Sequence, residues 1–299
     1  MLSRYETLFI KKMGHRVHPA ILFALARTRG VFNFTTGRDW RCCYGLDVKN
    51  RTKKAYSILF PDRSPTKLTL SRFIYQSIEE FQTATFRNRL FLKLFSLEGA
   101  EHVPEDKGAV LISFHTSNMP IVVSVISQKT GRSVSPLAYN LFRDPAVPTP
   151  VKKYFGFKYS MMLKYLNGGN LIYTNSPETM EKAAKAIEKK HLVLVISDLP
   201  DPKRKHVTKL LGQKLHLVTS ASRLARICEV PLIPVTISTL GFHRWQVTLH
   251  PPITEKDWRD MHKQAIRILE EQLKKEPYTW YSIDVMLDCL VEDAECATM

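Results

Sequence analysis

The sequence predicts an α/β fold, with a mainly parallel central sheet and helices on both faces. Short, nearly continuous apolar runs recur after residue 100, as expected for parallel strands that are buried on both sides. Helix-like segments lie between several of these runs, and this alternation is typical of a parallel sheet. With 299 residues and 44% hydrophobic content, the chain can bury one large core, so we expect a single domain over residues 1–299.

Residues 1–37 form a basic segment with interspersed apolar side chains. Six Lys and Arg residues are accompanied by one acidic residue, Glu6. The longest apolar run, "PAILFALA", is far shorter than the ~20 residues that a membrane-spanning helix requires, so we expect no transmembrane helix. No cleavage site follows an apolar core, as it would in a signal peptide. Two interpretations stay open: an amphipathic helix in the headgroup layer of a membrane, or a surface helix packed on its own domain.

The first strong helix signal covers residues 64–81. Ser64 is placed to cap this helix, and Pro65 to occupy its first position. Apolar residues then recur with helical spacing from Leu70 to Phe81, and they predict one buried face.

Strands and helices are predicted in alternation beyond residue 100. The predicted strands are residues 108–114, 133–139, 170–175, 192–197, 232–238 and 245–250. The predicted helices are residues 120–127, 177–190, 218–228 and 258–274. The last helix should bury a face formed by Met261, Ala265, Ile268, Leu269 and Leu273. The polar tail, residues 291–299, is expected to be flexible.

His115 follows directly on the strand predicted at residues 108–114. In sheets of this type, ligands bind beyond the carboxyl ends of the strands. Asn118 is placed to cap the next helix, and Pro120 to lie in its first turn. A histidine here could take a proton from a hydroxyl or amine that attacks an activated acyl group, and free N–H groups of the helix start could stabilise the oxyanion. The alternative is a histidine with a purely structural role.

Two acidic residues, Asp198 and Asp201, follow the strand predicted at residues 192–197. They should therefore lie at the same sheet edge as His115. A direct role in the site is one interpretation of Asp198. The other is turn formation, because Asp before Pro commonly starts a loop.

Basic side chains near this edge are candidates for binding phosphate groups. Lys203, Arg204 and Lys205 form a basic loop, and Arg143 follows another predicted strand. A solvated surface loop is the alternative for the first three residues. For Arg143 the alternative is a surface ion pair with Asp144.

The net charge of +16 predicts an acidic partner. Nucleic acid, an anionic membrane surface or an acidic protein would each fit. The chain has no zinc-finger or basic-zipper spacing and no RNP-type aromatic motif, so we do not expect it to bind nucleic acid. The five cysteines follow no repeated spacing and indicate neither a disulfide framework nor a zinc site, so we expect buried thiols in a reducing compartment.

Five blocks of sequence, spread from about residue 50 to residue 286, carry a further signal. They are "NRTKKAYSILFPDRSPTKLTLSRFIYQSIEEF", "LEGAEHVPEDKGAVLISFHTSN", "LVLVISDLPDP", "LLGQKLHLVTSASRLARICEVPLIPVTIS" and "EPYTWYSIDVM". In this order they resemble the bacterial lipid A late acyltransferases, the lauroyl and myristoyl transferases of the lysophospholipid acyltransferase superfamily. The resemblance implies a glycerolipid acyltransferase-like α/β fold without a bound cofactor. It also implies transfer of an acyl chain from a carrier-protein or coenzyme A thioester to a hydroxyl group. Tyr278 and Trp280 of the last block are expected to pack in the core.

The motif of the family that the chain resembles is His, four residues of any type, and then Asp or Glu. His115 and Asn118 match this pattern, but Pro120 occupies the acidic position. A carboxylate there would hold the imidazole tautomer and stabilise the imidazolium. We expect another group to replace it, either Asp198 or Asp201 from a different loop, or the amide of Asn118. A reaction that needs a weaker base, or a changed chemistry, stays open as well.

The sequence thus predicts an acyltransferase that acts at a membrane surface. His115, Asn118 and Asp198 are the expected catalytic residues, and Arg143 and the loop 203–205 are expected to bind the substrate. The expected partners are an acyl carrier protein and an anionic membrane or lipid A-like acceptor, at a cytoplasmic location peripheral to the inner membrane. Two alternatives stay open. One is transfer of an aminoacyl or other unusual acyl group from a nonribosomal-peptide-type carrier protein, and the other is a non-catalytic lipid- or carrier-binding protein on the same fold.

Overall fold

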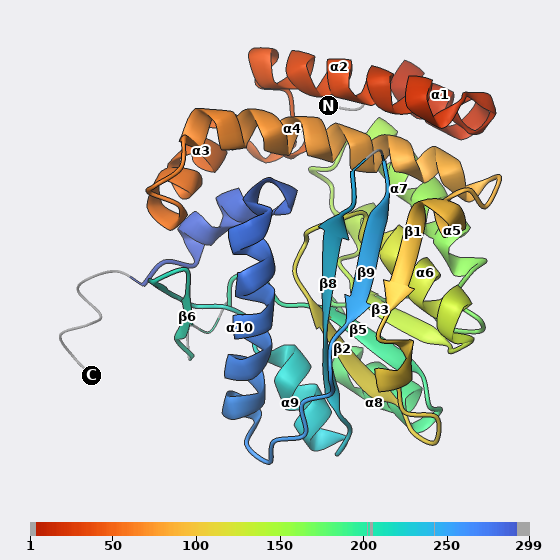
Figure 1. Ribbon diagram of the computed structural model, residues 1–299, viewed down its shortest axis with the longest axis vertical. Coiled ribbons are helices and arrows are strands. Elements are labelled where there is room, and N and C mark those ends of the chain that lie inside the picture. Colours follow the sequence, from red (N-terminus) through yellow and green to blue (C-terminus); the bar gives the residue numbers. More distant parts are fainter. Residues whose placement is uncertain (1–3, 202, 204–205, 242, 292–299) are drawn as a thin grey trace.

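The computed structural model describes residues 4–201, 203, 206–241 and 243–291, which build a central sheet covered by helices (Figure 1). Its strand order is β1-β9-β8-β2-β5-β3-β4, and neighbouring strands are parallel except for β8 and β9. The predicted α/β fold with a mainly parallel sheet is therefore confirmed. The strands are β1 Phe95–Glu98, β2 Ala109–Ser113, β3 Val134–Ala138, β4 Ile172–Tyr173, β5 Leu192–Ile196, β8 Leu232–Thr239 and β9 Trp245–Leu249.

All six predicted strands are present, and their ends differ from the prediction by at most two residues. Two features were not predicted: β1, and a separate antiparallel hairpin that joins β6 Thr208–Leu210 to β7 Gln213–Leu215. These strands are only three or four residues long, so their alternation does not stand out in the sequence. β8 and β9 are antiparallel because the short connection 240–244 cannot cross the sheet to begin a parallel strand.

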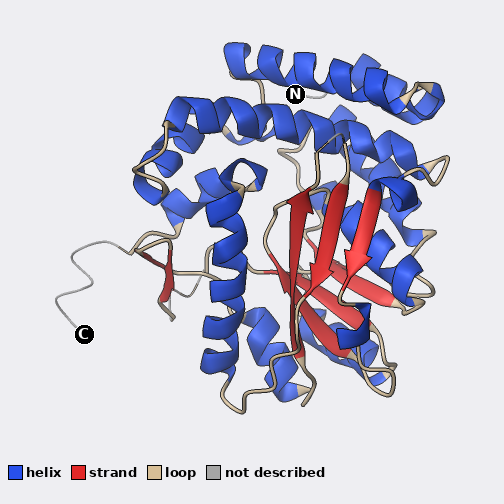
Figure 2. Cartoon of the chain, viewed as in Figure 1, coloured by secondary structure: helices blue, strands red, loops and turns tan. Residues whose placement is uncertain are grey.

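Helices cover both faces of the sheet, and the predicted ones are present as α4, α6, α8, α9 and α10 (Figure 2). As predicted, α4 begins at Pro65, and the Ser64 hydroxyl accepts the N–H of Lys67. The α-helices are α1 Arg4–Lys12, α2 Pro19–Thr36, α3 Val48–Leu59, α4 Pro65–Gln82, α5 Phe91–Leu94, α6 Met119–Thr130, α7 Thr149–Leu163, α8 Thr179–Glu188, α9 Ser220–Ile227 and α10 Trp258–Lys275. Four 3-10 helices matter below: η2 Trp40–Tyr44, η5 Leu141–Arg143, η6 Pro277–Thr279 and η7 Ile283–Asp288.

Successive residues of β2 face two different cores. Ala109 and Leu111 belong to one apolar cluster, together with residues of α6 and α7. Val110 and Ile112 belong to another, together with residues of α9 and α10. All four side chains are fully buried. A strand that is buried on both sides needs apolar residues at every position, which explains the continuous apolar run in the sequence.

The long helix α4 lies between the sheet and α2 (Figure 1). Gly30 allows α2 to approach α4 closely, because a Cβ at this position would come within 2.4 Å of the Cα atom of Ile74. Next to it, the Arg29 guanidinium donates to Glu6 of α1 and, at 2.6 Å, to Glu80 of α4. The C-terminal half of α4 is therefore buried on nearly all sides. The prediction of a single buried face was wrong for this helix, because it did not include the cover supplied by α2.

The face that was predicted for α10 is largely confirmed. Met261, Ala265, Leu269 and Leu273 are buried, and Ile268 is partly buried against the same cluster. Most of the predicted flexible tail, residues 292–299, lies outside the described residues. None of the described helices has the length and apolar character that crossing a membrane requires.

We expect Gly30→Ala to destabilise the protein. The added methyl group would overlap the backbone of Ile74 and push α2 away from α4. Helix propensity alone predicts the opposite sign, a stabilisation of up to about 1 kcal/mol. Urea unfolding followed by circular dichroism should show a loss of about 1–3 kcal/mol. Thr28→Ala on the exposed side of the same helix is the control, and an unchanged or higher midpoint for Gly30→Ala would contradict the close packing.

Candidate active site

His115 and Asp198 lie beyond the carboxyl ends of two neighbouring parallel strands. β2 and β5 pair in register up to Ser113 and Ile196. One further hydrogen bond follows, from the N–H of Ser197 to the carbonyl of Ser113 at 3.0 Å. His115 and Asp198 each come two positions after the last pair. The strand register therefore places them side by side.

The Asp198 carboxylate binds His115 twice. Its Oδ1 atom is 2.8 Å from Nδ1 of the imidazole ring, and its Oδ2 atom accepts the backbone N–H of His115 at 3.0 Å. Asp198 is fully buried, whereas 32% of the His115 side chain is exposed. The ring is thus held by a buried carboxylate and is open to a substrate. A carboxylate near His115 was expected because Pro120 occupies the acidic position of the motif, and Asp198 supplies it.

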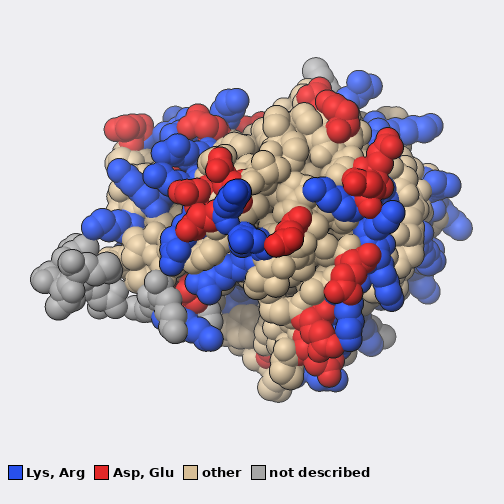
Figure 3. Space-filling model, turned by 90° about the horizontal axis from the view of Figure 1, so that it is seen from below, with Lys and Arg blue, Asp and Glu red and all other residues tan. Residues whose placement is uncertain are grey.

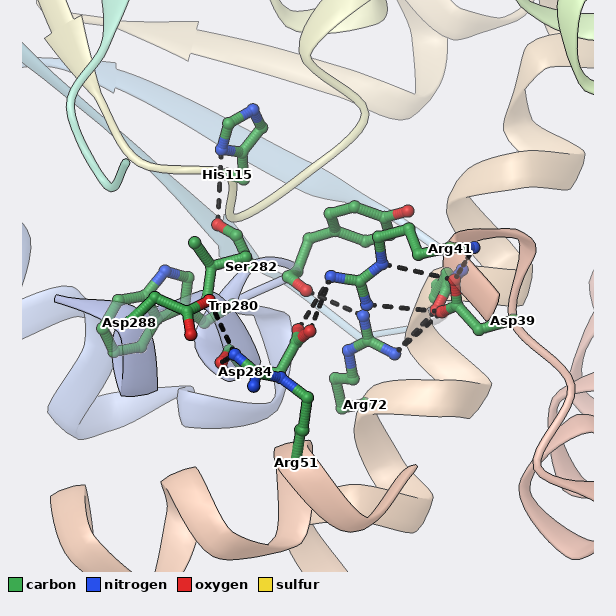
Figure 4. A network of polar contacts seen from close by, with 12 residues as sticks. Asp39, Arg41, Arg51, Arg72, His115, Trp280, Ser282, Asp284 and Asp288 are labelled. Carbon is green, nitrogen blue, oxygen red and sulfur yellow. Dashed lines mark hydrogen bonds and ion pairs between the residues drawn. The ribbon is translucent and has the colours of Figure 1, made fainter. Parts of the chain in front are cut away.

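Residues 280–282 complete the surroundings of this carboxylate. The indole N–H of Trp280 donates to Oδ2 of Asp198 at 2.8 Å, and the Ser282 hydroxyl donates to the same oxygen. The Ser282 oxygen also lies 3.3 Å from Nδ1 of His115 (Figure 4). The N–H of Tyr281 donates to the His115 carbonyl at 2.6 Å. One short segment therefore holds both members of the pair.

These contacts favour the ionised form of Asp198. Burial alone would raise the pKa of the carboxyl group, but the interaction with His115 and the hydrogen bonds from His115 and Ser282 lower this pKa below its ordinary value. An ionised carboxylate can only accept, so Nδ1 of His115 carries the proton and Nε2 keeps a free lone pair. The ring can take up a proton at Nε2, and the carboxylate would stabilise the resulting imidazolium.

Comparison with known proteins identifies the family. Residues 66–285 match the family model described as bacterial lipid A biosynthesis acyltransferase. The chain belongs to this family. It is therefore an acyltransferase, and the resemblance read from the five sequence blocks is confirmed.

Among solved structures, this acyltransferase is similar to the crystal structure of PlsC from Thermotoga maritima, a 1-acyl-sn-glycerophosphate acyltransferase. The two chains are 15% identical, and the match covers 86% of this chain and 97% of that chain with a TM-score of 0.42. No curated protein sequence matches the chain. The residue roles in this acyltransferase therefore rest on its own geometry.

Asn118 makes different contacts from those predicted. Its side-chain N–H group donates to the carbonyl of Glu79 at 2.6 Å and to the hydroxyl of Thr83 at 3.3 Å. It stands at the N-cap of α6, with Pro120 as the second helical residue, but its side chain makes no capping bond. The expected capping role was wrong. The side chain of Asn118 thus links the loop after His115 to α4. In the described part of the chain, the imidazole contacts Asp198 and Ser282 instead.

The second candidate acid, Asp201, makes hydrogen bonds to the backbone of a turn and not to the imidazole. Its carboxylate accepts the N–H of Lys203 at 3.0 Å, and its own N–H donates to the carbonyl of His216 at 2.9 Å. The Lys203 side chain is exposed. Arg204 and Lys205, the other members of the predicted basic loop, lie outside the described residues. The anion-binding role of this loop stays a prediction.

Arg143 is exposed at the end of η5, after β3. The neighbouring carboxylate of Asp144 accepts the hydroxyl of Tyr44 at 2.8 Å and the N–H of Ala146 at 2.9 Å. The ion pair between Arg143 and Asp144, considered as the alternative, is not among the contacts of the described residues. Arg143 therefore stays a candidate for an anionic ligand.

Sequence reasoning missed the polar roles of Trp280 and Ser282. Trp280 does pack in the core as expected, since it is fully buried and stacks on Phe114 with ring centroids 5.8 Å apart. A buried indole N–H needs an acceptor, and this requirement could have pointed to a buried carboxylate such as Asp198. Ser282 carries no comparable signal in the sequence.

We expect the neutral His115 ring to be protonated at Nδ1, because the Asp198 carboxylate accepts from that nitrogen. The ¹⁵N chemical shifts of the ring report which tautomer is present. Asp198→Ala should remove the preference, whereas Asp201→Ala, in the same loop, should leave it unchanged. A wild-type ring protonated mainly at Nε2 would contradict the geometry.

Proposed function

We propose that the protein transfers an acyl group from a carrier-protein or coenzyme A thioester to a hydroxyl group of a lipid A-like acceptor at a membrane surface. The observation that supports this most is the hydrogen bond between His115 and Asp198, 2.8 Å long, in a chain of an acyltransferase family. The partly exposed ring and the fully buried carboxylate are what a general base with an orienting acid requires.

In the proposed reaction, Nε2 of His115 takes the proton of the acceptor hydroxyl while the oxygen attacks the thioester carbonyl. The Asp198 carboxylate stabilises the imidazolium. The tetrahedral intermediate then collapses, the C–S bond breaks, and the leaving thiolate takes the proton from the imidazolium. The products are an ester and a free thiol, so the enzyme returns to its starting protonation state.

Backbone donors at the start of α6 would stabilise the negative oxygen of the intermediate. The helix begins at Met119, four residues after His115, and the first turn of a helix has N–H groups without intrahelical partners. Pro120 has no N–H group, so the donor would be the N–H of Met119 or of the loop before it.

Basic side chains would hold the phosphate groups of the substrates. We assign this role to Arg143, which is exposed and without a described acidic partner, and to the loop with Lys203, Arg204 and Lys205. Arginine binds phosphate with two hydrogen bonds, and lysine adds a compact charge. The phosphates could belong to a lipid A-like acceptor or to the pantetheine arm of the donor.

The outer face of α1 and α2 suits a peripheral position on an anionic membrane. The inner face of α2 packs on α4, as the second interpretation of this segment predicted, and the outer face is left for the proposed membrane contact. The exposed basic residues of this region are Lys12 of α1, Arg16 of the 3-10 helix between α1 and α2, and Arg27 of α2. The exposed large hydrophobic residues of the same region are Tyr5, Leu8, Met13, Ile21, Leu25, Val31 and Phe32. The face opposite these helices has acidic and basic side chains interspersed (Figure 3). We infer that α1 and α2 lie in the headgroup layer on the cytoplasmic side of the inner membrane.

We expect His115→Ala to lower acyl transfer by about 10²–10⁴-fold, because the general base is lost. Intact-mass spectrometry of a loaded carrier protein, with a lipid A-like acceptor present, measures the transfer. Asp198→Asn should lower it as well, while Asp201→Asn is the matched control and should not. Undiminished transfer by His115→Ala would refute the proposed role.

The same assay separates the donors. Transfer from an aminoacyl-loaded carrier protein, with none from an acyl-loaded one, would support the alternative donor class. If the folded wild type transfers neither group, the proposed reaction is contradicted and the non-catalytic binding protein is supported.

We expect the triple variant Lys12→Gln, Arg16→Gln, Arg27→Gln to bind anionic vesicles about 100-fold more weakly, since each well-placed charge contributes about 1 kcal/mol. Sedimentation with vesicles at low salt measures the binding. The control variant carries the same charge change at Lys129, Lys256 and Lys263, exposed residues outside α1 and α2. Equal weakening in both variants would place the membrane contact elsewhere.

A further inference from the structure

The segment 280–282, which holds His115 and Asp198, has no regular secondary structure of its own. It connects η6 to η7. A strand or helix is kept in place by its own ladder of hydrogen bonds, but this segment depends on contacts from other parts of the chain. Those contacts come from η2, near the start of the chain, and from α4 (Figure 4).

Arg72 of α4 makes the central contact. Its Nη2 atom donates to the carbonyl of Tyr281 at 2.7 Å, and its Nη1 atom donates to Gln76 at 2.8 Å. The guanidinium also packs against the ring of Tyr281, 5.1 Å from the ring centroid. Trp40 of η2 donates its indole N–H to the Tyr281 hydroxyl at 2.6 Å. Tyr281 is thus fixed at its backbone, at its ring and at its hydroxyl group.

A second arginine, Arg41 of η2, fixes the chain just after Ser282. It binds both carboxylate oxygens of Asp284, at 2.8 Å and 3.0 Å. Asp39 joins the two arginines, because one of its oxygens lies 3.2 Å from Nε of Arg41 and the other 3.4 Å from Nη1 of Arg72. We call Asp39, Arg41, Arg72 and Asp284 the four-charge cluster. Ser282 lies in the chain between Tyr281 and Asp284, and the cluster holds both of these neighbours.

The four-charge cluster is almost completely buried. The exposed fractions are 2% for Asp39, 7% for Arg41, 1% for Arg72 and 1% for Asp284. Burial would raise the pKa of Asp39, but Arg41 and Arg72 hold it well below its ordinary value, so its carboxylate stays charged. Buried ion pairs of this kind contribute little net stability compared with apolar residues of the same size. They supply directional contacts instead, since each planar guanidinium donates its hydrogen bonds only at fixed angles.

We propose that Arg72 is a positioning residue for acyl transfer, and that the four-charge cluster fixes segment 280–282 so that Trp280 and Ser282 orient the Asp198 carboxylate against His115. This inference rests on the proposed function. Three donors bind Oδ2 of Asp198: the His115 N–H, the Trp280 indole N–H and the Ser282 hydroxyl. With Oδ2 filled, Oδ1 is directed at Nδ1 of His115.

Movement of the segment would remove two of the three donors together. The carboxylate could then rotate, and the imidazole would lose its fixed direction. Substrate binding need not change, because Arg72 is buried and therefore not available to a substrate. The defect should therefore fall on kcat and leave KM nearly unchanged. A misplacement of about 1 Å costs on the order of 10²-fold in rate.

The first test is Arg72→Lys, which keeps the charge but cannot reach Tyr281, Gln76 and Asp39 with one planar group. We expect kcat to fall by about 10–100-fold with KM nearly constant, and the ring ¹⁵N shifts of His115 to show a weaker preference for the proton at Nδ1. Arg132→Lys is the matched control. Arg132 donates to the carbonyl of Lys107 at 2.9 Å and to the carbonyl of Lys190 at 2.7 Å, so its planar group also binds several partners but does not contact segment 280–282.

The second test changes Ser282, which binds the Asp198 carboxylate directly. It does not depend on the folding of Arg72→Lys. Ser282→Ala should lower kcat and weaken the Nδ1 preference of His115, and Ser282→Thr, which keeps the hydroxyl, should restore both. If Arg72→Lys and Ser282→Ala both leave kcat and the ¹⁵N shifts unchanged, the inference is refuted. Losses of the same size in Arg132→Lys would refute it too, because they would show that replacing any arginine with several backbone partners lowers the activity.

Failure of this inference can be told apart from failure of the proposed function. An active His115→Ala variant would refute the function. An inactive His115→Ala variant, together with fully active Arg72→Lys and Ser282→Ala variants, would leave the function intact and refute only the positioning role.

Discussion

The rest of the site depends on the buried carboxylate of Asp198. An ionised carboxylate with no exposure to solvent is tolerated only when hydrogen-bond donors surround it. Here the donors come from two places, the end of β2 and the segment 280–282. Each donor that stabilises the charge also fixes a piece of chain. The requirement to satisfy one buried group therefore brings the histidine, the second strand and the C-terminal segment into a single arrangement.

The sheet and the main pair of the site could be predicted from the sequence. Continuous apolar runs indicate strands that are buried on both faces, and the ends of parallel neighbours meet at one edge. That reasoning is enough to expect Asp198 near His115. It fails for Asn118, which is closer in the chain but turns toward α4, because proximity in sequence does not determine the direction of a side chain. The same reasoning predicts one buried face for α4, whereas α2 covers a further side. That cover depends on Gly30, a single residue with no periodic signal.

The residues that hold the pair in place leave almost no trace in the sequence. Ser282 is 167 positions away from His115 and belongs to no periodic pattern. An arginine such as Arg72, within an amphipathic helix, is expected to face solvent. It is buried instead because η2 and the segment 280–282 close over α4, and its charge is matched by Asp39, 33 positions away. Contacts between distant, irregular segments are decided by the packed fold and not by local preference.

A carboxylate that binds Nδ1 of the imidazole can come from the acidic position of the family motif or from the position of Asp198. The imidazole requires a carboxylate at Nδ1 that fixes its tautomer. The motif would supply that carboxylate from the first turn of the helix after the histidine, where this chain has Pro120. Here β5 supplies it, at a position set by the register of two paired strands, so the geometry of the pair follows the rigid sheet. Proline at position 120, the second residue of α6, costs no helical hydrogen bond, because the N–H groups of the first turn have no intrahelical partner.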